Sequence, residues 1–297
     1  MNLVLWAFIS ILIVYLLTVL VVGRQLMYND VLPKKIPNGK EQLKGYDYTD
    51  VEFKGFDGVT LRGWFIKSPN NPLNKTVFLL HGWRRSRSRY ISQIKFFVDS
   101  GFHVFTYDQR SHGASDPGLV TYGPDEAKDL LEAIKYAENY EYFNRKKIVA
   151  VGFSLGASAI VYAAVNQIFK AVAIEGIFSS SYDVGFEILA QKFGSIIARL
   201  IGDGVFTFGS LIWSLGKFWH SSPIDYIGKV SPTPIMVIRG DSDERVPSES
   251  IRRFSEKIKE PKEFWVHGGR HTTAYNQYPE EYKKRVVGFL NKYLDEK

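Results

Sequence analysis

Residues 147–165 read KIVAVGFSLGASAIVYAAV, and this stretch decides the fold class. It opens with a short apolar run of the kind found in a strand that is covered on both faces. It closes with a segment that has the character of a helix. Between the two lies Gly152-Phe153-Ser154-Leu155-Gly156, a G-x-S-x-G pattern that marks a sharp strand-to-helix turn. The stretch therefore predicts a strand, a tight turn that projects Ser154, and a helix.

This turn has the chemical properties of a nucleophile elbow. The backbone at such a serine is strained and its neighbours must be small, which Gly152 and Gly156 satisfy. The N-terminus of the following helix helps to stabilise negative charge near the serine oxygen. The pattern also occurs by chance in ordinary turns, but its position between a strand and a helix favours Ser154 as a nucleophile.

The chain on both sides of this turn alternates between strands and helices. Two runs around the turn signal Phe56-Asp57-Gly58 predict a β-hairpin, which would form an antiparallel edge. The other predicted strands are KTVFLLHG, FHVFTYD, KAVAIEG, TPIMVIRG and KEFWVHG, and a final helix begins near Pro279. This order predicts an α/β fold, with a mostly parallel sheet and helices on both faces. Functional loops are then expected at the carboxyl ends of the strands.

A serine nucleophile needs a base, and histidine is the usual one. In proteins with this turn the order along the chain is the serine, an acid, then the histidine, which leaves His220, His267 and His271. His271 lies in the loop GGRH between the last strand and the last helix, and this favours it as the general base. His267 ends the strand, as a structural histidine would, and His220 lies in an insertion.

Three carboxylates follow the strand TPIMVIRG and could orient the histidine: Asp241, Asp243 and Glu244. The spacing G-x-x-D-x-x-V-P favours Asp243 as the acid. Asp241 would otherwise make a turn hydrogen bond, and Glu244 would be solvated or paired with Arg245.

An oxyanion needs backbone donors near Ser154. One is the N–H of Leu155, the residue after the nucleophile, and the second is expected from Trp83, in the loop after KTVFLLHG. His81 in that loop could instead bind a metal ion, but no histidine or carboxylate lies at ligand spacing from it. We therefore expect no metal and no organic cofactor.

Five motifs in order resemble the α/β-hydrolase superfamily over roughly residues 50–297. They are His81-Gly82, the loop Asp108–Ser115, GFSLG, GDSDERVP and GGRH. The nearest resemblance is to membrane-anchored bacterial hydrolases of the serine aminopeptidase-like and Bem46-like group. The resemblance implies that the loop D-x-R-x-H-G-x-S has a structural role. One departure is Ser111, where the group commonly has glycine.

The N-terminal run Leu3–Val22 is uncharged and apolar, and at helical rise it would span about 30 Å, the thickness of a bilayer core. It is longer than a typical signal peptide, lacks a basic start and offers no A-x-A site, so a retained anchor is favoured over a cleaved signal. All nearby Lys and Arg residues follow the run, which favours a cytoplasmic domain. We expect an anchor over 1–25, a linker over 26–49 and an α/β-hydrolase domain over 50–297.

Composition narrows the remaining possibilities. The net charge of +7 suits a membrane surface, since no nucleic-acid-binding motif is present. The chain has no cysteine, which excludes disulfides, thiolate catalysis and Cys-ligated metals. The segment 179–224 is expected to form a small helical cap. Its aromatic side chains would then pack within the cap, form an apolar acyl pocket or touch lipid; they are Phe186, Phe193, Phe206, Phe208, Trp213, Phe218 and Trp219.

A cluster of four arginines, Arg84, Arg85, Arg87 and Arg89, follows Trp83. Cations oppose the dipole at a helix N-terminus, so stability alone does not explain them. They either form a solvated basic face or lie at the mouth of the site. Together these features predict a serine hydrolase acting on a small or lipid-like carboxylic ester. Amide hydrolysis, acyl transfer and a non-catalytic membrane-bound interaction module remain alternatives.

Overall fold

The computed structural model describes residues 3–28, 39–214, 221–246 and 248–295. Its centre is one eight-stranded sheet with the order β1-β2-β4-β3-β5-β6-β7-β8. β1 (Asp47–Lys54) and β2 (Thr60–Lys67) form the predicted antiparallel hairpin, and β2 pairs antiparallel with β4. The remaining neighbours are parallel: β3 (Thr76–Leu80), β4 (His103–Asp108), β5 (Ile148–Phe153), β6 (Val172–Glu175), β7 (Ile235–Gly240) and β8 (Lys262–His267).

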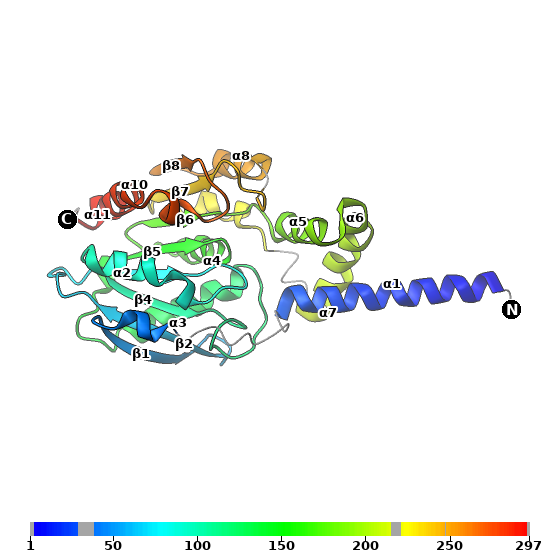
Figure 1. The fold of residues 1–297 in the computed structure, drawn as a ribbon, viewed down its shortest axis with the longest axis horizontal. Coiled ribbons are helices and arrows are strands. Elements are labelled where there is room, and N and C mark those ends of the chain that lie inside the picture. Colours follow the sequence, from blue (N-terminus) through cyan, green and yellow to red (C-terminus); the bar gives the residue numbers. More distant parts are fainter. Residues whose placement is uncertain (1–2, 29–38, 215–220, 247, 296–297) are drawn as a thin grey trace.

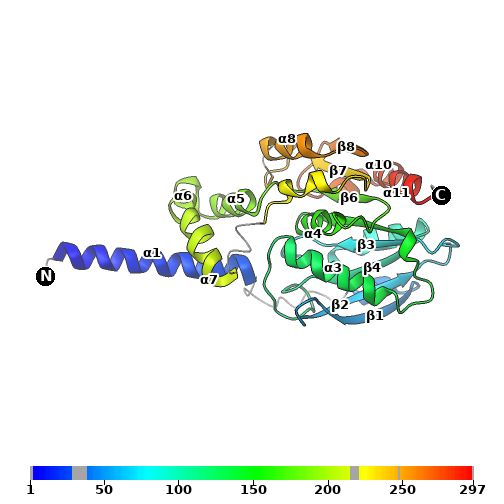
Figure 2. The ribbon, with the colours of Figure 1, turned by 180° about the vertical axis from the view of Figure 1, so that it is seen from behind.

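Helices cover both faces of this sheet, as Figures 1 and 2 show. One face packs against α3 (Pro124–Ala137) and α4 (Leu155–Ala164), with α8 (Ser248–Lys257) near the edge. The other face packs against α2 (Ile91–Asp99) and the C-terminal helical stretch, which comprises α10 (Pro279–Tyr282), a π-helical segment (Lys283–Val287) and α11 (Gly288–Asp295). α9 (Ala274–Gln277) precedes that stretch. The predicted α/β-hydrolase fold, with its hairpin edge, is confirmed.

A helical cap leaves the sheet between β6 and β7. It contains α5 (Ser181–Phe193), then α6 (Ser195–Gly204), a π-helical segment (Val205–Gly209) and α7 (Ser210–Ser214), which follow one another without a break. Phe206 is buried, whereas Phe193 and Phe208 are exposed. The side chain of Trp213 and the whole of Phe218 and Trp219 lie outside the described residues.

The first helix, α1 (Leu3–Tyr28), is long and apolar enough over Leu3–Gln25 to cross a membrane. It is more than a free tether, because its C-terminal half crosses the cap (Figure 1). Val19 and Gly23 are buried there, and Gly204 and Gly209 of the cap approach them closely: a Cβ at Gly204 would lie 2.8 Å from Val19 Cγ2. Small residues permit such close helix crossings. Residues 29–38 of the expected linker lie outside the described residues.

Candidate active site

Ser154 stands at the strained turn between β5 and α4. Its backbone has φ 52° and ψ −108°, a conformation that a non-glycine residue adopts only when the surroundings impose it. The two glycines explain the turn: a Cβ at Gly152 would lie 2.6 Å from the carbonyl of Gly156, and one at Gly156 would lie 2.5 Å from the Leu80 oxygen. The Ser154 N–H is held by the Glu175 carbonyl at 2.9 Å. The turn therefore presents the serine side chain at the carboxyl edge of the sheet.

His271 and Asp243 meet at this edge from the loops after β8 and β7. His271 Nδ1 lies 2.7 Å from Asp243 Oδ2, while Asp243 Oδ1 accepts the N–H groups of Arg245 and Val246. Burial alone would raise the pKa of Asp243, but the His271 hydrogen bond and these two donors bring the pKa below its usual value. Asp243 is thus held as a carboxylate against the ring.

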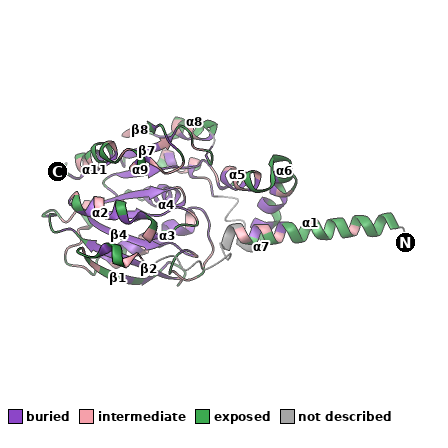
Figure 3. Cartoon of the chain, in the orientation of Figure 1, coloured by how far each residue is buried: buried purple, intermediate pink, exposed green. Residues whose placement is uncertain are grey.

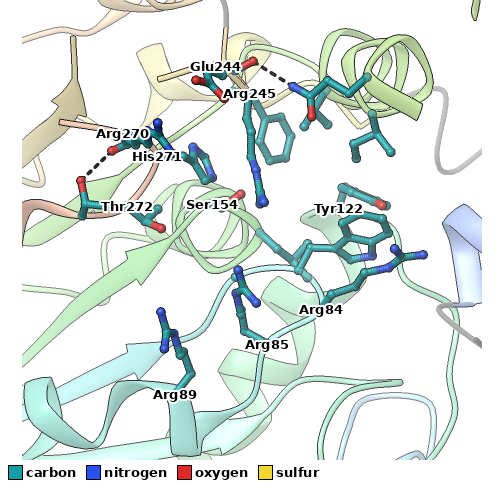
Figure 4. A pocket seen from close by; sticks show the side chains of 18 of the residues that line it. Arg84, Arg85, Arg89, Tyr122, Ser154, Glu244, Arg245, Arg270, His271 and Thr272 are labelled. Atoms are coloured by element: carbon teal, nitrogen blue, oxygen red, sulfur yellow. Dashed lines mark hydrogen bonds between the residues drawn. The ribbon is translucent and has the colours of Figure 1, made fainter. Parts of the chain in front are cut away.

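The opposite edge of the His271 ring faces the serine. Nε2 is buried and has no hydrogen-bond partner among the described residues, and Figure 4 shows the ring beside Ser154. Gly176 makes room for it, since a Cβ there would lie 2.7 Å from His271 Cε1. The arrangement leaves one ring nitrogen fixed by an acid and the other available to a hydroxyl.

The alternative acids do not contact His271. Asp241 is exposed and accepts a hydrogen bond from the neighbouring Ser242 hydroxyl, and Glu244 is exposed at the cavity wall. The turn interpretation of Asp241 therefore agrees with the structure, and Asp243 is the carboxylate placed next to His271.

The other histidines have different surroundings. His81 is fully enclosed, hydrogen-bonded to the Gly82 carbonyl and the Gln109 N–H, and burial lowers its pKa to about 4. His267 lies behind the site, 3.8 Å from Glu175 Oε1, and His220 lies outside the described residues. Among the described residues, no three histidine or acidic side chains gather as metal ligands would.

The two expected oxyanion donors lie on either side of the serine. Leu155 begins α4, directly after Ser154. Trp83 follows Gly82, whose Cβ position would be 3.4 Å from Ser154 Cβ, so the loop after β3 runs against the nucleophile. Both Trp83 and Leu155 line the cavity that contains Ser154.

The loop Asp108–Ser115 has the structural role that the resemblance implies. Asp108 accepts the backbone N–H groups of Arg87 and Ala114, and Arg110 forms a buried ion pair with Asp129 at 2.7 Å. Ser111 has φ 59°, a left-handed conformation that glycine adopts without strain, which agrees with the glycine that the resemblance implies at this position. Its hydroxyl donates to the Gly118 carbonyl at 2.6 Å and so helps to hold the turn.

The arginine cluster divides into two kinds of residue. Arg84, Arg85 and Arg89 line the cavity, as the second interpretation of the cluster expects. Arg87 does not line it: the side chain is buried, pairs with Asp108 and lies over the Trp64 ring, 4.4 Å from its centroid. Arg87 is therefore a structural residue that fastens the loop after β3 to the loop after β4.

The cavity in front of Ser154 has a volume of about 680 Å³. Val184 and Ile188 from α5 form part of its wall, together with Phe178. The cap aromatics with described side chains, Phe186, Phe193, Phe206 and Phe208, are absent from that wall, so of the three alternatives the wall does not support the aromatic acyl pocket for these four residues. The cap contributes aliphatic side chains instead.

Sequence reasoning missed Glu175, which ends β6 directly behind the site. Its Oε1 accepts the Ala274 N–H at 2.9 Å, three residues after His271, and its Oε2 is buried without a partner. Burial raises the pKa of Glu175 to about 7, and burial lowers the pKa of His267. Both directions favour the neutral forms of the two side chains. A strand that ends in a buried acid at the functional edge was the available signal.

A strained serine, a histidine held by an aspartate and a capped cavity at one edge of a parallel sheet define the hydrolase class of this fold. The sequence profile described as the alpha/beta hydrolase family matches residues 77–285. The chain therefore belongs to the α/β hydrolase family.

Individual relatives agree with this membership. YqkD of Bacillus subtilis is 23% identical over 90% of this chain and 88% of its own length. Protein bem46 of Schizosaccharomyces pombe is 27% identical over 75% of this chain and 71% of its own. Among solved structures, an esterase of Pyrococcus furiosus matches with a TM-score of 0.70 and 27% identity, over 89% of this chain and 96% of the esterase. The Bem46-like resemblance is confirmed.

Proposed function

We propose that this protein is a membrane-anchored serine hydrolase that cleaves carboxylic esters through Ser154, His271 and Asp243. The observation that carries the proposal is the contact between His271 Nδ1 and Asp243 Oδ2, with His271 Nε2 left open beside the strained Ser154. The similarity to an esterase at 27% identity supports an ester as the substrate.

The reaction would proceed by acyl transfer to water. His271 Nε2 takes the proton of the Ser154 hydroxyl, and the serine oxygen attacks the ester carbonyl. The backbone N–H groups of Trp83 and Leu155 hold the oxyanion, and His271 returns the proton to the leaving alcohol. A water molecule, deprotonated by His271, then releases the acid from Ser154.

A second candidate is transfer of the acyl group to an acceptor other than water. The chain is 22% identical to a protein named polyketide transferase grgF from Penicillium, over 83% of this chain and 97% of that protein. Transfer and hydrolysis share the acyl-enzyme and differ in what attacks it. Amide cleavage would also use the same three side chains.

Retention of α1 as an anchor is supported by its packing. Val19 and Gly23 bury against the cap, whereas a cleaved signal sequence would leave that cap face uncovered. The basic residues that follow α1 favour a cytoplasmic catalytic domain.

The test is labelling of the full chain, in detergent micelles, with a fluorophosphonate probe. Ser154→Ala should abolish labelling and lower ester turnover by about 10⁴- to 10⁶-fold, because no other group can form the acyl-enzyme. Ser242→Ala changes an exposed serine next to Asp243 whose hydroxyl donates to Asp241; it serves as the control and should label normally. Persistent labelling of Ser154→Ala would refute the nucleophile, and an unlabelled wild type would favour the non-catalytic interaction module.

A further inference from the structure

Six cationic side chains line the cavity in front of Ser154, against a single carboxylate. The cations are Arg84, Arg85, Arg89, Lys192, Arg245 and Arg270, and the carboxylate is Glu244. None of the six is paired with a carboxylate in the part of the chain that the structure describes. Their charge is therefore available to something that enters the cavity.

Arginines elsewhere in the fold behave differently. Arg62 pairs with Glu52 and Asp116, Arg110 pairs with Asp129, and Arg252 pairs with Glu249. The six cations of the cavity wall thus lack the acidic partners that these three arginines have.

Two of the unpaired arginines converge. Figure 4 shows Arg245, from the loop after β7, and Arg85, from the loop after β3, pointing from opposite walls into the space beside Ser154. Two guanidinium groups that approach each other without a counter-ion repel. An anion between them removes this repulsion and accepts hydrogen bonds from both, in the manner that guanidinium groups bind carboxylate and phosphate.

We propose that the substrate of this site is an ester that carries a carboxylate or phosphate group, bound by Arg85 and Arg245 while its carbonyl lies at Ser154. This proposal rests on the proposed function. The apolar wall formed by Phe178, Val184 and Ile188 receives the uncharged part of the same molecule.

The test compares matched pairs of esters, in which one member carries an anionic group and the other does not. A soluble pair is 4-nitrophenyl hydrogen adipate and its methyl ester, and a lipid pair is monoacylglycerol phosphate and monoacylglycerol in the same detergent. The full chain carrying Arg85→Gln and Arg245→Gln is compared with Arg145→Gln and Arg285→Gln, which change the net charge equally at exposed positions outside the cavity.

The cavity variant should lose about 10- to 100-fold of its preference for the anionic member, measured as the ratio of kcat/KM values and carried mainly by KM. The control variant should keep the preference. If the preference for the anionic member falls in the lipid pair alone, the anion is a lipid headgroup. If the preference falls in the soluble pair as well, the site also takes free anionic esters. Equal losses on both members of a pair, or none, would overturn the proposal. Failure of the proposed function is distinguishable, because the wild type would then hydrolyse no ester and the fluorophosphonate probe would not label Ser154.

A separate observation concerns the outer side of the cap. From Ser195 to Ile212 the chain is apolar and long enough to pass for a membrane span, yet it crosses α1 instead of running beside it (Figure 2). One side of this stretch packs inward through Ala198, Val205 and Phe206. The other side exposes large apolar side chains: Ile196, Ile197, Leu200, Phe208, Leu211 and Ile212.

We infer that the stretch 195–212 lies in the bilayer surface, with this exposed side toward lipid. α1, itself apolar and exposed over most of its length, touches the same stretch at Gly204 and Gly209. These contacts run from Tyr15 to Gly23, in the domain-side half of the span Leu3–Gln25. The exposed apolar side of the stretch therefore lies at a depth where lipid buries it. The cavity is then held at the membrane surface.

The chain has no cysteine, so single cysteines can be labelled without background. Leu200→Cys carries a fluorescent dye in full-length protein reconstituted into vesicles of phosphatidylglycerol and phosphatidylcholine. Leu12→Cys on α1 is the positive control, and Glu132→Cys on α3 is the aqueous control. Doxyl-labelled lipid should quench the dyes at Leu200 and Leu12 and leave the dye at Glu132 unaffected. Quenching at Leu12 alone would overturn the inference. In that case, quenching of the Leu200 dye by aqueous iodide would show that the position faces water, and protection from iodide would show that a second copy of the chain covers it. Absence of quenching at Leu12 would instead refute the anchor.

Discussion

The parallel strands and the cap bury their apolar side chains to very different degrees (Figure 3). Every residue of β3, β4, β5 and β6 is buried, and helices close both faces of these strands. The cap leaves Ile196, Leu200 and Leu211 at least 61% exposed. The sheet is thus a complete core that fixes the loops of the site, whereas the cap is complete only with α1 beside it. Catalytic geometry should therefore depend on the sheet, and access to the cavity on the cap.

The largest effect should come from the loops that the sheet fixes. Asp243→Asn removes the acceptor that sets the tautomer of His271, so kcat should fall by about 10⁴-fold. Asp241→Asn, two residues away in the same loop, should stay near the wild-type rate because Asp241 does not contact His271. Steady-state ester hydrolysis measures both. The reverse ranking would transfer the role to Asp241.

A smaller loss should follow from displacing the His271 ring without removing a functional group. Gly176→Ala places a Cβ 2.7 Å from His271 Cε1 in a backbone with φ 67°, and we expect a loss of kcat of about 10- to 100-fold. Gly58→Ala is the matched control, since Gly58 also has a positive φ of 88° but has nothing within 4 Å of the added atom. Equal effects of the two substitutions would show that backbone strain alone is responsible.

Changes in the cap should affect turnover less. Gly204→Ala puts a Cβ 2.4 Å from the Tyr15 hydroxyl and should separate α1 from the cap, with a loss of turnover below about tenfold. Gly288→Ala in α11, where the added atom meets nothing within 4 Å, controls for the change in helix propensity. Limited proteolysis should cut α5–α7 faster in the first variant only. Unchanged proteolysis would mean that the α1 contact does not hold the cap in place.

The smallest effect on turnover should come from Glu175→Gln. This substitution should instead change how the free energy of unfolding depends on pH. Burial raises the pKa of Glu175 in the folded state to about 7, compared with its ordinary pKa of 4.5. Between these two pH values the folded state keeps a proton on Glu175 that the unfolded state has lost. The stabilisation is complete below pH 4.5 and is lost as the pH rises through 7. The wild type should therefore lose a few kcal/mol between pH 5 and pH 8 that the glutamine variant does not lose. Thermal unfolding of both proteins across that range checks this, and parallel curves would contradict it.

Much of the fold was predictable because its signals are local. A run such as KTVFLL or the G-x-S-x-G turn at Ser154 carries its conformation within a few residues, and all the predicted strands appear in the sheet. Asp243 and His271 were selected by their spacing and chain order, and the rule that loops gather at the carboxyl ends of parallel strands implied that they would meet.

What could not be predicted depends on partners distant in the sequence. Arg87 has the same charge as Arg85, and only its contact with Asp108, from the next strand's loop, makes it structural. The acid at the end of the apolar run KAVAIEG is visible in the sequence, but the enclosure of Glu175 depends on distant residues such as Ala274. The sequence left three alternatives open for the cap aromatics, namely packing within the cap, an acyl pocket and lipid contact, because the burial of a residue such as Phe206 depends on the position of α1.

The crossing of α1 and the cap has a consequence for the order in which the protein matures. Val19 leaves the ribosome among the first residues, while its neighbour Gly204 is synthesised far later, so the contact closes one of the longest loops in the chain. The sheet residues between them can assemble before this closure. The cap therefore completes its packing only after α1 has been delivered to its final place, and biosynthesis itself would link a working hydrolase to successful insertion.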